Sequence, residues 1–252
     1  MNVSRSVLIT GATGRLGADL VGYFARSGYR VIFQYRSLEA EARAAEGHLR
    51  SDGFDVSAVF GSFDTEQETV DFVRRVENHY GCPGILINNA SAFKYDFPGK
   101  MDFSLLNDSL NIHIRVPAIL IELFASAGKS RGQNIDVINI IDQKTRNLNP
   151  DYFSYSIGKF GLMGLTSLWQ RACVGHVRVF GLYPGLMSIS GDQTEERFLL
   201  DSKKSLLQRS VTSSDVYEGM IYLLNSKSRF GTDLVIDAGE SIVPRARDVA
   251  YE

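Results

Sequence analysis

The amino-acid sequence predicts a single α/β domain, built as a doubly wound parallel sheet of about seven strands with helices on both faces. Short apolar runs alternate with amphipathic segments of helix length along the whole chain, which is typical of parallel strands joined by crossover helices. The 252 residues are 44% hydrophobic and 22% charged, the ordinary composition of one large globular domain. No repeat, linker or low-complexity tract interrupts the alternation, so one domain is expected across 1–252.

Each predicted strand is a short apolar run. The strands are expected at 6–10, 30–35, 56–61, 84–90, 135–141, 177–184 and 233–238. The helices are expected at 15–27, 38–51, 65–80, 102–128, 152–173 and 213–226, the last of which opens with the helix-start signal TSSDV. The polar, irregular segment 186–210 follows the sixth strand, and we expect it to form a mobile lid over a site at the carboxyl ends of the strands.

Charge and cysteine content argue against nucleic acid, a membrane surface and a metal ion as partners. A net charge of -2 and a pI of about 6.1 give no concentrated basic face for nucleic acid or an anionic membrane. Cys82 and Cys173 have no metal-ligand spacing, nor do the four histidines, so reduced thiols, no metal and a cytoplasmic location are expected. A strand and a glycine turn begin within the first ten residues, which leaves no room for a signal peptide, and no apolar run is expected to span a bilayer.

The stretch TGATGRLG at 10–17 follows the first strand and opens the first helix. Its glycines permit a tight turn and let a pyrophosphate approach the backbone N–H groups of the helix N-terminus, as in a Rossmann-type unit. Gly11, Arg15 and Leu16 are therefore expected to contact a dinucleotide. The alternative is an ordinary turn from strand to helix.

The stretch QYRS at 34–37 ends the second strand, where an NAD enzyme carries an acid for the ribose hydroxyls. Arg36 instead presents a planar donor fork suited to a 2′-phosphate, with Tyr35 and Ser37 beside it. The sequence therefore favours NADP(H) over NAD(H). The alternative is an arginine that is simply solvated at a strand end.

Four motifs now occur in a familiar order: the glycine turn, NNAS at 88–91, Tyr155 with Lys159 four residues later, and YPG at 183–185. In order and spacing they resemble the short-chain dehydrogenase/reductase family over nearly the whole chain. In that family the tyrosine is the general acid/base, and the lysine lowers the tyrosine pKa and holds the nicotinamide ribose. The resemblance implies further cofactor contacts from Ser62, Asn89, Ala90, Ser91, Lys159, Pro184, Gly185 and Ser188.

Asp142, thirteen residues before Tyr155, stands where most members of the family have a serine. An ionised carboxylate repels a developing alkoxide, so simple ketone reduction fits poorly. A carboxyl group can instead assist proton delivery to a ring nitrogen or bind an amino-pyrimidine edge. The set of Asp142, Tyr155 and Lys159 resembles the pteridine reductase branch, which includes dihydromonapterin reductase-like proteins. The alternative is a polar residue where a strand runs into a loop.

Arg15 and Phe93 support the same branch. Arg15 matches an arginine that approaches both cofactor phosphate and substrate in those enzymes, and Phe93 matches an aromatic that sandwiches a flat pterin against the nicotinamide. The resemblance implies a substrate site made of Arg15, Ser91, Phe93, Asp142 and Tyr155. The alternatives are that Phe93 is a buried loop aromatic and that Arg15 pairs with phosphate alone.

Two positions depart from the family pattern. The family's helix asparagine, which helps to order a water beside the lysine, aligns with His113, and this histidine is either a proton relay or a structural residue. The aspartate that commonly contacts adenine aligns with Ser62, with Asp64 two residues later. Adenine contact is therefore expected through Ser62.

The favoured function is NADPH-dependent hydride transfer to a small molecule of the pterin or dihydrofolate type. One alternative is an NADPH-dependent carbonyl reductase of a 3-oxoacyl thioester or small ketone, with Asp142 tolerated or protonated. A second is a non-catalytic NADP(H)-binding sensor, against which the intact Tyr155 and Lys159 argue. The long apolar segments 102–128 and 152–173, together with the habit of the family, imply a homotetramer.

Overall fold

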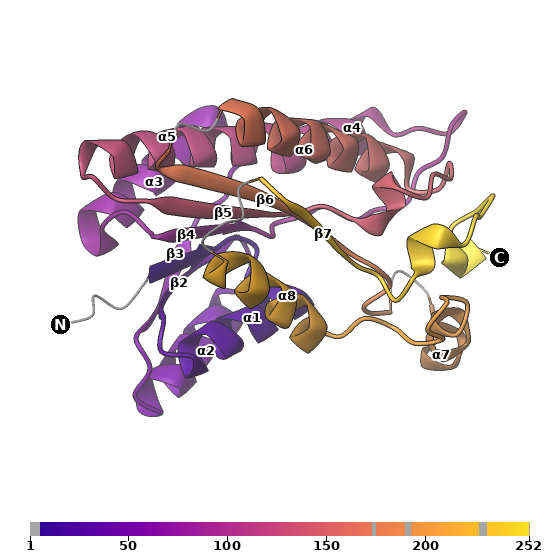
Figure 1. Cartoon of the computed structure of the whole chain (residues 1–252), viewed down its shortest axis with the longest axis horizontal. Helices are drawn as coiled ribbons and strands as arrows, with labels where there is room; N and C mark the ends of the chain where they lie inside the picture. Colours follow the sequence, from indigo (N-terminus) through magenta and orange to yellow (C-terminus); the bar gives the residue numbers. More distant parts are fainter. Residues whose placement is uncertain (1–5, 173–174, 190–192, 227–230, 252) are drawn as a thin grey trace.

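The computed structural model describes residues 6–172, 175–189, 193–226 and 231–251, and its centre is a seven-stranded parallel sheet (Figure 1). The strand order is β3-β2-β1-β4-β5-β6-β7. The strands are β1 (Ser6–Ile9), β2 (Arg30–Tyr35), β3 (Val56–Phe60), β4 (Ile85–Asn88), β5 (Ile135–Ile140), β6 (Val177–Pro184) and β7 (Asp233–Ile236). The predicted doubly wound α/β fold is confirmed, and each strand ends within two residues of its expected bounds.

Helices cover both faces of this sheet (Figure 1). On one face lie α3 (Glu66–Tyr80), α4 (Phe103–Leu110), α5 (Val116–Ser130) and α6 (Phe153–Ala172). On the other face lie α1 (Arg15–Arg26), α2 (Glu39–Ser51) and α8 (Ser213–Asn225). The short helix α7 (Glu195–Ser202) lies within the expected lid, at the end of the molecule where the C-terminal segment also lies (Figure 1).

The sheet is buried from both sides, as parallel sheets are. Every residue of β4 and β5 is buried. One core lies between the sheet and the α1/α8 face, around Phe24 and Met220, and a second lies under α3 and α5, around Phe72 and Phe124. Each of these side chains is 0% exposed, and full burial of such a side chain contributes about 1.5–3 kcal/mol.

Of the two cysteines, only Cys82 lies in the part of the chain that the structure describes. Cys82 is a buried free thiol, and burial raises its pKa to about 11, so it is an inert core residue at neutral pH. Cys173 lies outside the described residues.

The expected helix 102–128 is longer and less regular than the sequence suggests. A π-helical turn, Asn111–Arg115, separates α4 from α5. Pro117 supplies a physical reason, because it has no N–H to donate to the carbonyl of His113 four residues earlier. Single π-helical turns occur frequently at functional sites.

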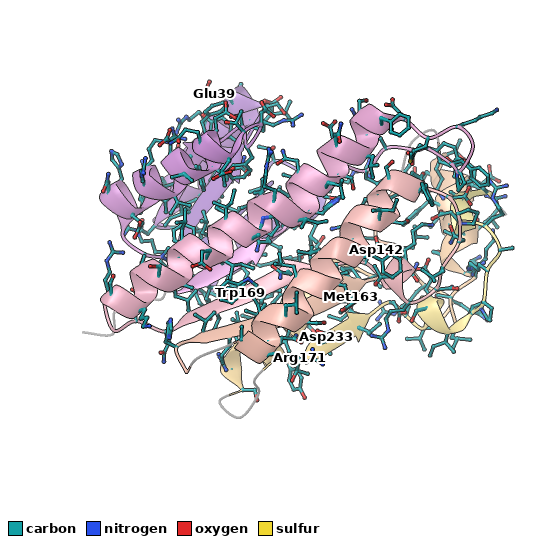
Figure 2. All side chains as sticks on the ribbon, turned by 90° about the horizontal axis from the view of Figure 1, so that it is seen from above. Glu39, Asp142, Met163, Trp169, Arg171 and Asp233 are labelled. Carbon is teal, nitrogen blue, oxygen red and sulfur yellow. The ribbon has the colours of Figure 1, made fainter. Side chains whose placement is uncertain are left out.

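The same segment corrects one expectation. Phe103–Ser130 contains an 18-residue window with a mean hydropathy of 1.4, so it is long and apolar enough to span a membrane by length and composition alone. In the fold it lies alongside α6 and buries Val116, Leu120 and Phe124 against the sheet (Figure 2). A core helix of this kind meets the same criteria as a membrane span.

The loops after β1 and β4 meet where the strand order reverses, the usual place for a ligand in such a sheet. Thr10 Oγ1 accepts hydrogen bonds from the backbone N–H groups of Asn89 and Ala90, each at 3.0 Å. Gly11 has φ +63°, and a Cβ there would lie 2.6 Å from Ala90 Cα. The two loops therefore touch so closely that only glycine fits at position 11.

Candidate active site

A cavity of about 800 Å³ opens at the carboxyl ends of the strands. Most of the predicted site residues line it: Gly11, Arg15, Leu16, Arg36, Ser37, Ser62, Asn89, Ala90, Ser91, Phe93, Asp142, Tyr155, Gly185 and Ser188. Tyr35, Lys159 and Pro184 do not line it. Among the residues that the structure describes, no group of histidine, cysteine and acidic side chains is arranged to hold a metal ion.

Asp142, Tyr155 and Lys159 come together beneath the cavity. Asp142 follows β5 and lies beside the N-terminal end of α6 (Figure 2), and Tyr155 Oη donates a hydrogen bond of 2.5 Å to its Oδ2. Lys159 Nζ lies 5.6 Å from the centroid of the Tyr155 ring and donates to the carbonyl of Ile140 at 2.7 Å. Since an ammonium has three N–H donors, two remain for a ligand.

Burial and the neighbouring carboxylate both make Tyr155 less acidic. Burial raises the pKa of Tyr155 well above its usual value, and the nearby charge of Asp142 raises it further. Burial also raises the pKa of Asp142 and lowers that of Lys159 to about 8. The effect expected of Lys159 on the Tyr155 pKa is opposed by burial and by Asp142, and it stays a prediction. The Tyr155 hydroxyl is therefore protonated at neutral pH and directs its hydrogen to Asp142.

Asp142 also organises the turn that follows β5. Its Oδ1 accepts a hydrogen bond of 2.7 Å from the backbone N–H of Lys144, so both carboxylate oxygens are engaged. The carboxyl group is therefore held in one orientation by α6 on one side and by its own turn on the other. The alternative of a polar residue where a strand runs into a loop is compatible with the bond to Lys144, whereas the bond from Tyr155 is the contact that the catalytic interpretation requires.

Arg36 lies at the edge of the cavity, near Ser37 and Ser62. Arg36 Nη1 lies 3.8 Å from Asp64 Oδ1, and the two side chains are 70% and 65% exposed. An exposed ion pair of this length contributes about 0–1 kcal/mol, so an incoming anion can replace Asp64 at little cost. Tyr35 has another role, since its hydroxyl donates to Glu39 Oε1 at 3.0 Å on the α2 side of the sheet.

Gln34 is a cavity residue that the sequence analysis missed. Its buried amide accepts from the N–H of Gly11 at 2.8 Å and donates to the carbonyl of Gly61 at 2.5 Å. One side chain on β2 thus fixes the loops after β1 and β3. A polar residue inside the apolar run RVIFQY was the available signal.

Phe93 is the aromatic wall of the cavity and is 43% exposed, so it is not a buried loop residue. Its ring stacks on Tyr152, with centroids 4.1 Å apart and planes 20° from parallel, and meets the edge of Tyr155 at 4.7 Å. Tyr152 itself has φ 54°, a left-handed conformation that is rare for a bulky residue. The ring of Phe93 is therefore held by Tyr152 on one face and by Tyr155 in an edge-to-face contact.

Arg15 joins the glycine turn to the segment after β6. Its Nη1 donates a hydrogen bond of 2.7 Å to the carbonyl of Ile189, and both residues line the cavity. The guanidinium has five N–H donors, so this one bond leaves donors for an anion or a planar ligand.

Residues 5–197 match the family model described as short chain dehydrogenase. The chain belongs to the short-chain dehydrogenase family. Among its curated relatives, the dihydromonapterin reductase of Klebsiella pneumoniae is 25% identical, with 94% of this chain and 97% of the relative covered. That of Enterobacter sp. (strain 638) is 26% identical with the same coverage. These relatives confirm the resemblance to the dihydromonapterin reductase-like branch.

Solved structures agree with the family assignment. The FolM alternative dihydrofolate reductase 1 from Brucella suis, in complex with NADP, superposes with a TM-score of 0.91 at 27% identity, covering 98% of this chain and 99% of that one. The Brucella canis protein, also complexed with NADP, gives a TM-score of 0.90 at 28% identity, covering 97% and 96%. The similarity therefore extends over the whole fold.

In this short-chain dehydrogenase the cavity is also lined by a C-terminal segment that sequence reasoning did not identify. Asp248 and Val249 line the cavity beside Lys144. The Lys144 ammonium, 5% exposed, donates to Asp248 Oδ2 at 2.8 Å and to Asn149 Oδ1 at 2.5 Å. Arg247 binds both carboxylate oxygens of buried Asp151. The Lys144–Asp248 and Asp151–Arg247 pairs each join residues about a hundred positions apart, so no local sequence pattern indicates them.

Glu240 is a second acidic residue of the cavity that sequence reasoning missed. Its carboxylate accepts from Gln143 Nε2 at 3.0 Å and from the backbone N–H of Leu186 at 2.7 Å. Burial, opposed by the Leu186 bond and supported by the charge of Asp142, raises its pKa to about 7. Glu240 therefore ties the turn after Asp142 to the base of the expected lid.

The Asp248→Ala variant is expected to lose about 3 kcal/mol of unfolding free energy, because the buried Lys144 ammonium then lacks its charged partner. Thermal melting should show a fall of roughly 6–12 °C for a chain of this size. Asp71→Ala, which removes an exposed ion pair with Arg74, is the matched control and should change stability by less than about 0.5 kcal/mol. Equal effects in the two variants would contradict a structural role for the Lys144 pair.

Proposed function

We propose that this short-chain dehydrogenase is an NADPH-dependent reductase of a pterin or dihydrofolate-like substrate. The observation that carries the proposal is the hydrogen bond of 2.5 Å between Tyr155 and Asp142, in place of a serine hydroxyl. A carboxylate at this point suits a ligand with N–H donors and a ring nitrogen to protonate, and it opposes an alkoxide. Dihydromonapterin reductases among the curated relatives, and FolM alternative dihydrofolate reductases complexed with NADP among the solved structures, support it.

The chain offers a suitable cradle for NADP(H). Gly11 and Gly17 leave no space for a Cβ, so backbone N–H groups at the start of α1 can approach a pyrophosphate closely. Arg36 and Ser37 would hold the 2′-phosphate, and Ser62 would lie near the adenine. Asn89, Ala90, Gly185 and Ser188 would line the nicotinamide half, with Lys159 on the ribose.

When bound, NADPH supplies a hydride to a carbon of a C=N bond. The chain must then deliver one proton to the nitrogen of that bond, and Tyr155 Oη is the donor. Asp142 holds this hydroxyl in place and offers its carboxylate to an N–H group of the ligand. Phe93 presents one ring face to a flat heterocycle, since its other face is occupied by Tyr152.

The proposal is tested by following NADPH oxidation by the purified protein with three kinds of substrate side by side: dihydropterins, dihydrofolate, and small ketones or acetoacetyl thioesters. Turnover of a pterin or dihydrofolate is expected. Turnover of ketones alone would replace the proposal with a carbonyl reductase. Tight NADPH binding with no turnover at all would favour a sensor protein.

The Arg36→Asp variant is expected to raise the Kd for NADPH by about tenfold to a hundredfold while changing the Kd for NADH by less than threefold. The physical reason is that the 2′-phosphate loses a charge-assisted bidentate partner and meets a like charge. Fluorescence titration measures both constants. Arg74→Asp on the exposed face of α3 is the control, and a similar effect there would attribute the change to overall charge.

The proposal extends to the surroundings of the site. Segment 186–210 acts as a lid that carries Leu186 to Ile189 against the cavity, and one domain spans 1–252. The protein works in the cytoplasm as a homotetramer, without nucleic acid or membrane. Exposed apolar side chains on α4 and α6, Phe103 at 70% and Leu168 at 68%, support self-association.

A further inference from the structure

Three side chains form a line of hydrogen bonds from the core to the cavity. Ser109 Oγ lies 3.0 Å from His113 Nδ1, and His113 Nε2 lies 2.8 Å from Ser91 Oγ. His113 is 0% exposed, on the π-helical turn, while Ser91 is exposed and lines the cavity. Both ring nitrogens are thus engaged by protein groups.

The position of the ring hydrogen follows from the partners. Nδ1 is the ring nitrogen on the Ser109 side, and a hydrogen bond with the backbone of Ser109 favours the protonated imidazole, as an accepting carbonyl does. We therefore assign the ring hydrogen to Nδ1. Burial, and then the nearby charge of Lys159, lower the pKa of His113 well below its usual value, so the ring is neutral. Nε2 is then an acceptor, and the Ser91 hydroxyl must donate to it.

We propose that His113 is a positioning residue that fixes the hydroxyl hydrogen of Ser91 toward its own Nε2, so that Ser91 Oγ faces the cavity as an acceptor only. A ligand group at this point must then be a donor, such as a ring N–H, an amino group or a hydroxyl. The inference deepens the proposed reductase function, on which its substrate assay rests, because reduced heterocycles with amino groups carry such donors.

Gly158 on α6 leaves room for the His113 ring. A Cβ on Gly158 would lie 2.6 Å from His113 Nδ1 and 2.3 Å from Ser109 Oγ, closer than real Cβ contacts. Glycine at the position before Lys159 therefore leaves the space that the imidazole fills. The ring also meets Tyr155 edge to face, with centroids 5.4 Å apart, so it lies directly beside the proton donor.

A double-mutant cycle tests the coupling. Ser91→Ala and His113→Leu are each expected to lower kcat/KM for a dihydropterin about tenfold, equivalent to about 1.4 kcal/mol. The double variant should also lose about tenfold, because both changes remove the same oriented acceptor. A loss near a hundredfold would mean that the two side chains act independently and would overturn the proposal. His48→Leu, on the exposed face of α2, is the matched control.

A second measurement does not depend on turnover. Nitrogen NMR of the ¹⁵N-histidine-labelled, NADPH-bound protein should show His113 neutral, with its hydrogen on Nδ1, from pH 6 to 8. A hydrogen on Nε2, or an imidazolium in this range, would overturn the proposal. If the wild type reduces no pterin or dihydrofolate while this tautomer is observed, the proposed function fails and the orientation of Ser91 stands.

Discussion

Replacing Tyr155 with phenylalanine is expected to lower kcat by about a thousandfold while leaving the Kd for NADPH within threefold. Tyr155 lines the cavity, its hydroxyl donates to Asp142 and is the proposed proton donor, and general acid catalysis contributes roughly 10²–10⁴ in rate. The ring itself is retained, so its contacts with Phe93 and His113 persist. Single-turnover kinetics would separate the chemical step from binding.

Tyr80→Phe at the C-terminal end of α3 serves as the control, since Tyr80 does not line the cavity. A Tyr155→Phe enzyme that kept most of its kcat would show that another group delivers the proton. Asp142 would then be the candidate, because burial raises the pKa of its carboxyl and makes the protonated form more available.

The Asp142→Ala variant is expected to lower kcat/KM for a pterin by about a hundredfold and to leave NADPH binding unchanged. It removes the acceptor that orients Tyr155 and the carboxylate offered to ligand N–H groups, each a charge-assisted hydrogen bond of about 1.5–3 kcal/mol. The charge of Asp142 also raises the pKa of Lys159, which burial lowers to about 8. Without that charge, Lys159 loses its proton at lower pH, so the alkaline limb of the pH profile should move downward.

Asp142→Ser gives the informative comparison, because it restores the hydroxyl that is usual in the family. Activity with small ketones should rise in this variant while pterin reduction stays low. If both variants reduced pterins at the wild-type rate, Asp142 would be a structural residue that holds the turn at Lys144. Circular dichroism and melting of all three proteins establish that they remain folded.

The sequence predicted the fold well because its signals are local. Each strand is a short apolar run, and the glycine turn requires Gly11 whatever the rest of the chain does. The π-helical turn was not predicted, since the missing N–H of Pro117 permits several local outcomes and packing against α6 selects one. Propensity alone cannot rank such alternatives.

The candidate site likewise has residues that local spacing predicts and contacts that it does not. Asp142, Tyr155 and Lys159 follow a spacing that a reader of the sequence can recognise, and the structure brings them together. The ion pair between Lys144 and Asp248 joins two segments about a hundred residues apart, and both partners are ordinary charged residues in the sequence. Contacts of this kind become visible only when tertiary structure brings the two segments together.

Tyr152 combines a strained backbone with a side chain that supports the aromatic wall of the cavity. Its left-handed backbone, φ 54°, costs of order 1–3 kcal/mol, and it immediately precedes the helix that carries Tyr155. Glycine would relax that backbone and would also remove the ring on which Phe93 rests. A Tyr152→Gly exchange would therefore relieve backbone strain and leave the Phe93 ring without its stacking partner, so the stability of the fold and the rigidity of the cavity wall place opposite demands on this residue.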